Sequence, residues 1–494
     1  YSDDKEWLKL LDVVAKLESL TDSPEQKIKY LLTLAMVCQR ELHDSERALS
    51  FYERVLALDA RHTKASTESL SLSLQLGKLD ISERLLNEQL QRAQQDNSHT
   101  ELLAVFLQLG QLYKERLQRA DAAIDAFEAA QTLDPQNAVC FQALDELYAT
   151  DLERYRDRAI ALHTAQLHHN PFTPEPYQQL RRLYTGLRRA DPAWCLCRTL
   201  NALSLSSAEE DQFYERLHSD EAVALEEPLV QEDWQLLLHP DTDPLLTAIF
   251  SILEPVVLQL RASPIQSLGY DPANAIDVEG SEHPGAQALL YVGGALAQPL
   301  PLAFDDNALG EPLSLLPTEP PAVVMGAPFI DLNTPTQSLV FASARAFCGL
   351  LPGLRLRHFL ASGTGFKSWL LAAIRLNTPA FPIPAELLGP VEEAHAALRE
   401  ALPPQSRDEL SRLIAKLLQN PSALDVKQWQ VGVDFSADRL GLLLANDLRT
   451  AIEAIRAGSA ELTPMQASRI KELVLFSVDE NYFELRKRLR IAIA

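Results

Sequence analysis

Residues 123–135 read Ala-Ile-Asp-Ala-Phe-Glu-Ala-Ala-Gln-Thr-Leu-Asp-Pro, and this stretch decides the fold of the N-terminal half. The small residues Ala123 and Ala130 share one helix face with the aromatic Phe127, and Pro135 ends the helix because proline cannot continue it. Small residues let a neighbouring helix approach closely, and the aromatic ring fills the gap at the next interface. The stretch therefore predicts the second helix of a tightly packed helix pair.

The same spacing recurs along the first half of the chain. Gly110 and Tyr113 precede the copy that contains Phe127, one copy lies 36 residues after it, and another lies earlier. The two further copies consist of Ala159, His163, Gln166 and Pro171, and of Ala48, Tyr52, Val55 and Ala60. This period is close to the roughly 34 residues of a helix-turn-helix repeat.

These residues resemble the tetratricopeptide repeat (TPR) family. The resemblance implies an α-solenoid of about five helix pairs between residues 24 and 205, with Trp7–Leu20 as the closing helix of an earlier unit. A single pair cannot bury its apolar stripe, so neighbouring pairs must stack. Such an array binds a peptide or another protein, and the alternative is an array that only stacks against the rest of its own chain.

Composition and charge limit the classes of partner. The chain has 494 residues, too many for one compact core, and its 45 basic and 68 acidic residues give a net charge of −23. Nucleic acids and anionic membrane surfaces need clustered cations, so the sequence predicts neither as the partner. The longest apolar run, Leu245–Leu260, is interrupted by Glu254 and Pro255, and the sequence predicts no transmembrane segment.

The five cysteines, a small and odd number, favour a reducing cytoplasm over a secreted disulfide framework. Cys195 and Cys197 lie two residues apart, a spacing that points helical side chains about 200° away from each other. His163 and His168 are also poorly aligned for sharing an ion. We therefore expect buried thiols and solvated histidines here, with no metal and no cofactor.

The amino-acid composition changes after the repeats. From residue 229 to residue 340 there are 14 acidic residues and one basic residue, Arg261, together with prolines and short β-like runs. We predict two domains, a TPR-like α-solenoid at 1–225 and an α+β domain with a small sheet and extra C-terminal helices at 226–494. The predicted fold class is mainly α.

The second domain has an informative order of predicted elements. Helices are expected at Pro244–Leu260 and Ala286–Ala297, strands at Pro299–Phe304 and Ala322–Met325, and a helix at Ser338–Leu351 with Thr334 as its N-cap. Later helices are expected at Val391–Ala401, Ser406–Gln419, Ala437–Ala457 and Pro464–Phe476. The basic amphipathic end, Tyr482–Ala494, is expected to dock on the acidic surface of its own chain or to fray.

This order resembles the catalytic core of the HtpX-like and CaaX-protease-like zinc metallopeptidases. In that family an apolar strand and an edge strand ending in glycine precede a helix with the HExxH motif, and a later helix supplies the third ligand from an ExxAD motif. Val323–Ile330 stands where the resemblance places the edge strand, and Asp434–Gly441 is similar to the later motif. The resemblance implies a groove in which an extended peptide lies along the edge strand.

At the zinc-binding positions the sequence departs from the family. Ala344 and Cys348 stand in place of the histidines, and Arg345 stands in place of the general-base glutamate. Catalytic zinc needs three protein ligands, whereas a methyl group binds no metal and a guanidinium is permanently cationic. We predict a degenerate former zinc site without metal, cofactor or hydrolysis, made of Ala344, Arg345, Cys348, Asp434 and Asp438.

Arg345 offers a replacement for the lost metal charge. Buried carboxylates without a cation are strongly destabilising, so Arg345 is predicted to pair with Asp434 or Asp438, the alternative being a solvated arginine. Gly363–Ser368 matches a phosphate loop only in part, because the spacing fails, and is interpreted as a structural loop.

The leading functional hypothesis is a non-catalytic, cytoplasmic scaffold that binds protein or peptide partners. Before residue 229 the chain has 38 acidic and 25 basic residues, which favours a basic or neutral partner. The degenerate domain would keep a groove flanked by Ala322–Gly326 and the Ser338–Leu351 helix, and would bind by strand addition. An active hydrolase with an unrecognised site and a structural subunit of a large assembly are the alternatives.

Overall fold

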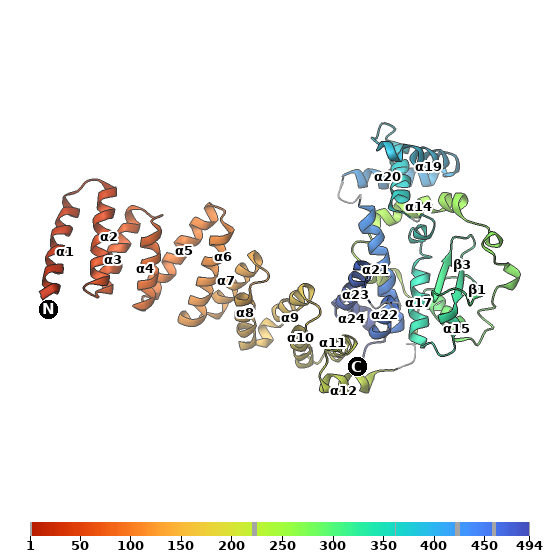
Figure 1. Cartoon of the computed structure of the whole chain (residues 1–494), viewed down its shortest axis with the longest axis horizontal. Coiled ribbons are helices and arrows are strands. Elements are labelled where there is room, and N and C mark those ends of the chain that lie inside the picture. Colours follow the sequence, from red (N-terminus) through yellow and green to blue (C-terminus); the bar gives the residue numbers. More distant parts are fainter. Residues whose placement is uncertain (1, 220–224, 361, 420–424, 457–460, 494) are drawn as a thin grey trace. The chain divides into compact units, whose positions relative to one another are not determined.

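The structure is a computed structural model that describes residues 2–219, 225–360, 362–419, 425–456 and 461–493. By its internal contacts the chain divides into two compact units, Tyr1–Leu162 and His163–Ala494. Figure 1 shows helix pairs in the first unit and a helical second unit that contains a small sheet. This boundary lies earlier in the chain than the domain boundary predicted after residue 225. The reason is that the last repeat helices pack within the second unit.

The first unit is built from consecutive helices joined by short turns. They are α1 (Ser2–Leu20), α2 (Pro24–Arg40), α3 (Ser45–Leu58), α4 (Thr63–Gln75), α5 (Leu79–Gln95), α6 (His99–Gln111), the π-helix η1 (Leu112–Leu117), α7 (Ala120–Leu133), α8 (Ala138–Thr150) and α9 (Leu152–His169), whose last residues enter the second unit. With α10 (Pro174–Gly186) and α11 (Ala190–Ala202), five helix pairs follow α1, so the predicted number of pairs and the separate first helix are confirmed.

Helix pairing in the first unit depends on the small and aromatic residues that recur in the sequence. A Cβ atom added to Gly110 in α6 would lie 2.7 Å from the Phe127 ring of α7, so only glycine allows this approach. Ala123, Phe127 and Ala130 are all buried against neighbouring helices. In the first pair Ala48 and Tyr52 occupy the corresponding buried places.

The helix α6 continues as the π-helix η1, which the sequence did not predict. This segment ends at Gln118, whose φ of 52° is left-handed and stops the helix. Within it the Tyr113 hydroxyl donates a hydrogen bond of 3.1 Å to the Glu83 carboxylate on α5. Through this hydrogen bond the π-helix η1 links its own repeat to the preceding one, which contains α5.

The second unit begins with the last repeat helices and continues as a mainly helical domain. After α11 its elements are α12 (Ala208–Leu217), α13 (Gln231–Leu237), α14 (Pro244–Arg261), η2 (Ile265–Leu268), η3 (Pro272–Asn274), α15 (Pro284–Ala295), β1 (Leu302–Asp306), β2 (Leu313–Leu316), β3 (Ala322–Gly326), α16 (Ala327–Ile330), α17 (Thr336–Cys348), η4 (Leu354–His358), α18 (Gly363–Asn377), η5 (Ala385–Leu387), α19 (Leu388–Ala401), α20 (Pro404–Gln419), α21 (Val426–Ala445), α22 (Leu448–Arg456), α23 (Pro464–Phe476) and α24 (Glu480–Arg488). The prediction of a mainly α chain with a small sheet in its C-terminal part is confirmed.

The sheet has the strand order β1-β3-β2. Strand β1 is parallel to β3, with Leu302 opposite Ala322, and β2 is antiparallel to β3, with Leu313 opposite Met325. The edge strand that the resemblance implied at Val323–Ile330 is therefore wrong, because its first half belongs to the central strand β3 and its second half is the short helix α16. Strand β3 is buried along its whole length and lies between two others.

Several predicted helix boundaries need correction. The helix α17 begins at Thr336 after Pro335, and Thr334 does not cap it, since its hydroxyl donates to the Pro328 carbonyl oxygen at 2.6 Å. The predicted helix Ala437–Ala457 is two helices, α21 and α22. They are separated at Asn446, whose φ of 53° is left-handed.

Two further sequence predictions differ from the structure. Gly363–Ser368 is not a loop but the first turns of α18, which Ser362 caps by accepting a hydrogen bond of 3.1 Å from the Gly365 N–H. His163 was expected to be solvated, yet only 2% of its surface is exposed. The predicted burial of Cys195 and Cys197 is confirmed.

Among the described helices, only α14 is long and apolar enough to cross a membrane. The sequence predicted no such segment, because Glu254 and Pro255 interrupt the run, but the helix continues through both residues. Length and composition are a weak indication, since the core helix of a globular unit passes the same test. Leu246, Phe250 and Leu253 of this helix are buried in the core of the second unit.

Candidate functional site

The centre of the second unit is the contact between α17 and α21. Gly441 of α21 lies so close to Phe341 of α17 that an added Cβ atom would be 2.5 Å from the ring. All five residues of the predicted degenerate site lie on these two helices. Ala344, Arg345 and Cys348 belong to α17, and Asp434 and Asp438 belong to α21.

Asp438 is the fully buried residue at the centre of this contact. Its two carboxylate oxygens accept hydrogen bonds of 2.7 Å from Nε and Nη2 of Arg469, which comes from α23. Nε of Arg345 forms an ion pair with the same carboxylate at 3.1 Å. Of the two partners predicted for Arg345, Asp434 or Asp438, the structure shows Asp438, and Arg469 adds a second cation.

Asp434 lies one helical turn before Asp438 and has a different partner. Its carboxylate is 3.5 Å from Nη2 of Arg357 in η4, and a quarter of its side-chain surface is exposed. Burial lowers the pKa of Arg345, while the Asp438 carboxylate opposes this shift. Asp434 and Asp438 are thus neutralised by three arginine side chains, Arg345, Arg357 and Arg469.

Ala344 and Cys348, the other two predicted site residues, are both fully buried. Burial raises the pKa of Cys348 to about 12, although the nearby Arg345 opposes the shift, so the thiol is neutral at physiological pH. A thiolate is the form that binds metals and attacks electrophiles. Across the described residues, no three His, Cys, Asp or Glu side chains are placed to hold a metal ion.

A second buried charge network, which the sequence did not predict, joins α21 to α23. Arg439 donates two hydrogen bonds, of 2.8 and 2.5 Å, to one oxygen of Glu472, and its guanidinium lies over the Phe476 ring. Burial lowers the pKa of the neighbouring His239 to about 4 and raises that of Glu472 to about 7. The His239 Nδ1 atom accepts a hydrogen bond of 3.1 Å from the Asp241 N–H, which requires an unprotonated ring.

The basic C-terminal segment docks on acidic residues of the second unit, as one of its two predicted outcomes. Arg486 is 1% exposed and donates hydrogen bonds of 2.8 to 3.1 Å to the Asp191 carboxylate of α11. Its guanidinium also lies over the rings of Trp194 and Tyr482. Helix α24 is therefore anchored rather than frayed.

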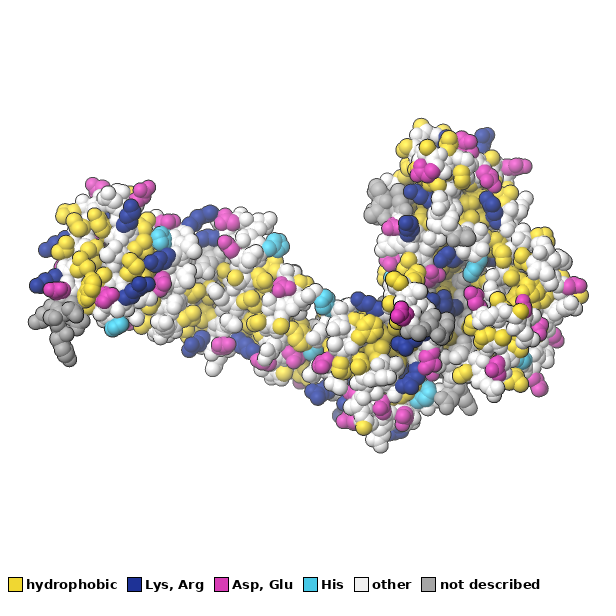
Figure 2. Space-filling view, in the orientation of Figure 1, with side chains coloured by type: hydrophobic (Ala, Val, Ile, Leu, Met, Phe, Trp, Pro, Cys, Tyr) yellow, Lys and Arg dark blue, Asp and Glu magenta, His cyan; other side chains and the backbone are white. Residues whose placement is uncertain are grey.

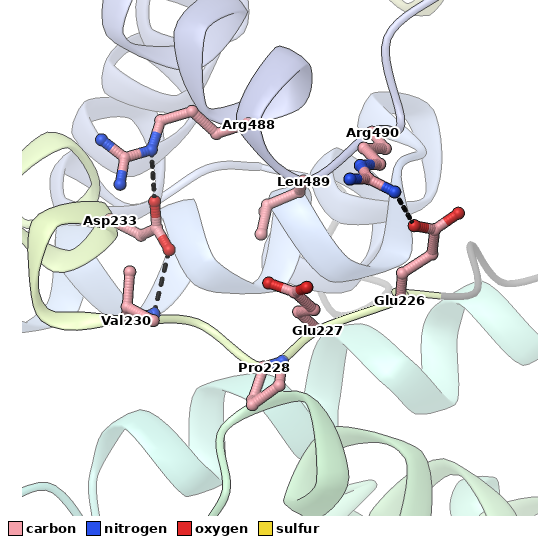
Figure 3. Close-up of a pocket in the computed structure, with 8 residues that line it drawn as sticks. All are labelled: Glu226, Glu227, Pro228, Val230, Asp233, Arg488, Leu489 and Arg490. Atoms are coloured by element: carbon pink, nitrogen blue, oxygen red, sulfur yellow. Dashed lines mark hydrogen bonds and ion pairs between the residues drawn. The ribbon is translucent and has the colours of Figure 1, made fainter.

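Two of the pockets lined by described residues lie on the surface of the second unit. Figure 3 shows the smaller, of about 130 Å³, in which Arg488 pairs with Asp233 at 2.9 Å and Arg490 pairs with Glu226. The larger, of about 310 Å³, lies where α18 and α21 begin. Its lining residues are Gly363, Thr364, Lys367, Glu386, Leu387, Asp425, Val426 and Lys427. Both pockets contain acidic and basic side chains, three and two in the smaller and two and two in the larger, so neither has the one-sided charge of an ion-binding site.

The second helices of the first unit carry a ladder of ion pairs, each between an acidic residue of one helix and an arginine of the next. The pairs are Glu18 with Arg54, Glu53 with Arg84, Glu83 with Arg119 and Asp121 with Arg154. We call this set the ion-pair ladder. It joins α1, α3, α5, α7 and α9 in sequence.

The first helices meet on another side of the repeats. Gln39 of α2 donates a hydrogen bond of 2.9 Å to Glu68 of α4, and Lys114 of η1 pairs with Glu146 of α8 at 2.5 Å. Exposed side chains near these contacts include Thr67, Ser71 and Gln142. We define the first-helix face as Lys64, Thr67, Ser71, Gln142 and Glu146.

Comparison with known proteins supports the repeats and gives no support for a metallopeptidase-like domain. No curated protein matches the chain. A crystal structure of a thermophilic TPR protein from Thermus thermophilus is similar at 19% identity and a TM-score of 0.18, over 38% of this chain and 97% of that chain. Residues 103–137, which form most of α6, η1 and α7, match a family model described as tetratricopeptide repeat. Residues 103–137 are therefore a tetratricopeptide repeat within the array of helix pairs.

Proposed function

We propose that the protein is a non-catalytic scaffold that binds another protein or peptide through the first-helix face. The tetratricopeptide repeat at 103–137 carries this proposal, because such stacked helix pairs are typical protein-binding surfaces. The ion-pair ladder occupies the second helices with intramolecular contacts. The first-helix face has exposed hydroxyl and amide groups at Thr67, Ser71 and Gln142, of which Thr67 and Gln142 bond only within their own helices.

The net charge supports a basic or neutral partner. Before residue 229 the acidic residues outnumber the basic ones by 38 to 25. On the first-helix face Glu146 already pairs with Lys114, which leaves hydrogen bonding and shape to select the partner. We expect charge to affect mainly the rate of association and its salt dependence.

A peptide-display selection on the full chain tests this proposal. Selected peptides are measured by fluorescence anisotropy against the wild type and against a variant with Thr67→Arg and Ser71→Arg. We expect at least a tenfold loss of affinity, since two large cations would block the face. Ser50→Arg, at an exposed position of α3, is the matched control and should bind as the wild type does. Equal binding to all three proteins would contradict the proposal.

A second candidate is strand addition at β2. The predicted groove at Ala322–Gly326 cannot accept a peptide strand, because β3 is paired on both sides. In the described sheet β2 has a single strand neighbour, so its other edge is the position for an added strand.

Charge complementarity indicates a basic peptide at that edge. Residues 262–344 contain nine acidic and no basic residues. In Figure 2 acidic side chains lie over the part of the second unit that holds the sheet. The charge-reversal variant Glu311→Lys, next to β2, should weaken binding of a Lys-rich extended peptide. Unchanged binding would remove this candidate.

We also propose that the protein catalyses no reaction and that it is located in the cytoplasm. The arginines around Asp438 and the neutral Cys348 thiol support a non-catalytic centre, and five buried, free cysteines agree with a reducing compartment. An unrecognised hydrolase and a structural subunit are the competing functions. Stoichiometric zinc in elemental analysis of the purified protein would favour the first, and a large particle mass in light scattering would favour the second.

A further inference from the structure

The segment that joins α18 to η5 in the second unit is rich in proline. Between the end of α18 at Asn377 and the start of η5 at Ala385 the chain reads Thr-Pro-Ala-Phe-Pro-Ile-Pro. None of these residues belongs to a helix or a strand. We call Phe381–Pro384 the proline segment.

The residue types of the proline segment favour an extended, left-handed backbone. The pyrrolidine rings fix φ at about −65° in Pro382 and Pro384, and a following proline disfavours the helical region for Phe381 and Ile383. At Pro384 the backbone angles are φ −56° and ψ 140°, close to those of a polyproline II helix. This is the conformation in which proline-rich peptides are recognised by other proteins.

Both ends of the proline segment are held, and its middle is open. At the start the Phe381 N–H donates a hydrogen bond of 2.9 Å to the Thr378 carbonyl oxygen. At the end the Pro384 carbonyl oxygen accepts one of 3.0 Å from the Leu387 N–H. Pro382 lies between them and is exposed, and no N–H of a described residue donates to its carbonyl oxygen. A partner can therefore reach both an apolar ring and a free acceptor.

Local structure accounts for two of the prolines and not for the third. Pro379 takes the second position of the turn that the hydrogen bond between Phe381 and Thr378 closes, where proline is favoured. Pro384 is the residue that precedes η5. Pro382 has neither place, so neither the turn nor the start of η5 requires it.

The surface next to the proline segment is hollowed. The pocket of about 310 Å³ is lined by Glu386 and Leu387, which follow the segment in the chain. This opening leaves room beside the segment for side chains of a docked protein.

The chemistry of the segment specifies the kind of partner. Proline rings offer apolar faces that pack on aromatic rings, and the solvated carbonyl oxygens of a polyproline II helix accept hydrogen bonds from tryptophan N–H or tyrosine O–H groups. A segment that is already ordered loses little conformational entropy on binding. A groove lined by aromatic side chains fits both features.

We propose that the proline segment docks into an aromatic-lined groove of another protein, of the kind that binds polyproline II helices. Pro382 is the central residue of this contact. The segment acts as the ligand, whereas the first-helix face acts as a receptor, so the inference does not depend on the proposed function.

Three domains with such grooves, an SH3, a WW and an EVH1 domain, serve as probes for the full chain. Each domain is labelled and titrated with the wild type in fluorescence anisotropy. We expect at least one domain to bind, and Pro382→Ala with Pro384→Ala to weaken this binding by about tenfold or more. Replacing the main aromatic residue of that domain's groove by alanine should abolish the binding.

A second pair of prolines is the matched control. Pro264 and Pro272 are exposed, and Pro264 has similar backbone angles, φ −59° and ψ 133°. Pro264→Ala with Pro272→Ala should therefore bind as the wild type does. The single variant Pro382→Ala should also weaken binding, which keeps the test decisive if the double variant fails to fold. Absence of binding by all three domains, or equal binding to the wild type and to Pro382→Ala, would overturn the inference.

Discussion

At the scale of the residue, Gly110 has the clearest structural requirement in the first unit. An added methyl group would lie 2.7 Å from the Phe127 ring, so Gly110→Ala should destabilise by about 1–3 kcal/mol through overpacking. Gly294→Ala in α15 is the control, since no atom lies within 4 Å of its added Cβ. It should be neutral or stabilise by about 0.5–1 kcal/mol. Urea unfolding followed by circular dichroism measures both, and equal effects would refute the packing argument.

His239 and Glu472 should give the stability of the second unit opposing pH dependences. The pKa of His239 is about 4 because burial disfavours its charge, so its contribution is present above about pH 6.5 and is lost as the pH falls towards 4. The pKa of Glu472 is about 7 because burial disfavours its carboxylate, so its contribution is lost as the pH rises from about 4.5 to 7.

Single substitutions separate the two contributions. In His239→Asn only Glu472 of this pair remains, and between pH 4.5 and 7 the free energy of unfolding should fall by about 2–3 kcal/mol relative to the double variant His239→Asn with Glu472→Gln. In Glu472→Gln the free energy should rise over the same range. Urea unfolding at several pH values measures both slopes. Parallel slopes in the two variants would contradict these assignments.

The charge pairing at the candidate site was predictable only in part. Arg345 stands where a metal-binding motif would need a carboxylate, and that chemical mismatch suggested a pair with Asp434 or Asp438 without deciding between them. Arg469 gives the shorter contacts, yet it lies on another helix, 31 residues after Asp438. The sequence around Arg469 does not indicate which buried carboxylate this arginine pairs with.

At the scale of the element, Asp438 holds α17, α21 and α23 together. Arg345→Met should cost about 1 kcal/mol, because the bidentate pair with Arg469 still neutralises the carboxylate. Arg345→Met with Arg469→Met should cost about 3–5 kcal/mol, since Asp438 is then a buried charge without a partner. Adding Asp438→Asn to this double variant should recover part of the loss. A double variant no less stable than Arg345→Met would exclude this role.

Two arginines of the C-terminal segment, Arg486 and Arg490, allow a matched comparison of a buried and an exposed ion pair. Arg486→Met should cost about 3–5 kcal/mol, because Asp191 would remain buried without its cation. Arg490→Met should cost less than about 0.5 kcal/mol, since this arginine and Glu226 are 71% and 62% exposed. Urea unfolding measures both variants. Equal costs would show that burial does not decide the strength of these pairs.

Local patterns predicted the existence of most helices better than their ends or the strand order. Helix α23 has the predicted bounds, because Thr463, Pro464 and Gln466 form a complete N-terminal capping signal. The break at Asn446 lacks a glycine or proline and was missed. Strand β2 is short and only half-buried, so it gives no clear alternation. Without β2, the resemblance implied an edge strand at Val323–Ile330, whose first half lies in the central strand β3.

At the scale of the whole molecule, repetition explains why the first unit was the more predictable. Each repeat packs on its neighbours in sequence, so a local pattern specifies the tertiary contact. In the second unit Asp191 pairs with Arg486 and Ser436 bonds His239, contacts that span 295 and 197 residues. Such contacts follow from the packing of the complete unit and not from any local motif.

Because each unit has its own core, calorimetry of the full chain should show two unfolding transitions. Gly110→Ala changes a contact within the first unit and should lower only one transition temperature, by several degrees for about 1–3 kcal/mol. Arg486→Met changes a contact within the second unit and should lower only the other. Leu17→Asp, at an exposed position of α1, should move neither transition. If Gly110→Ala and Arg486→Met both lowered the same transition, the two cores would form one cooperative unit.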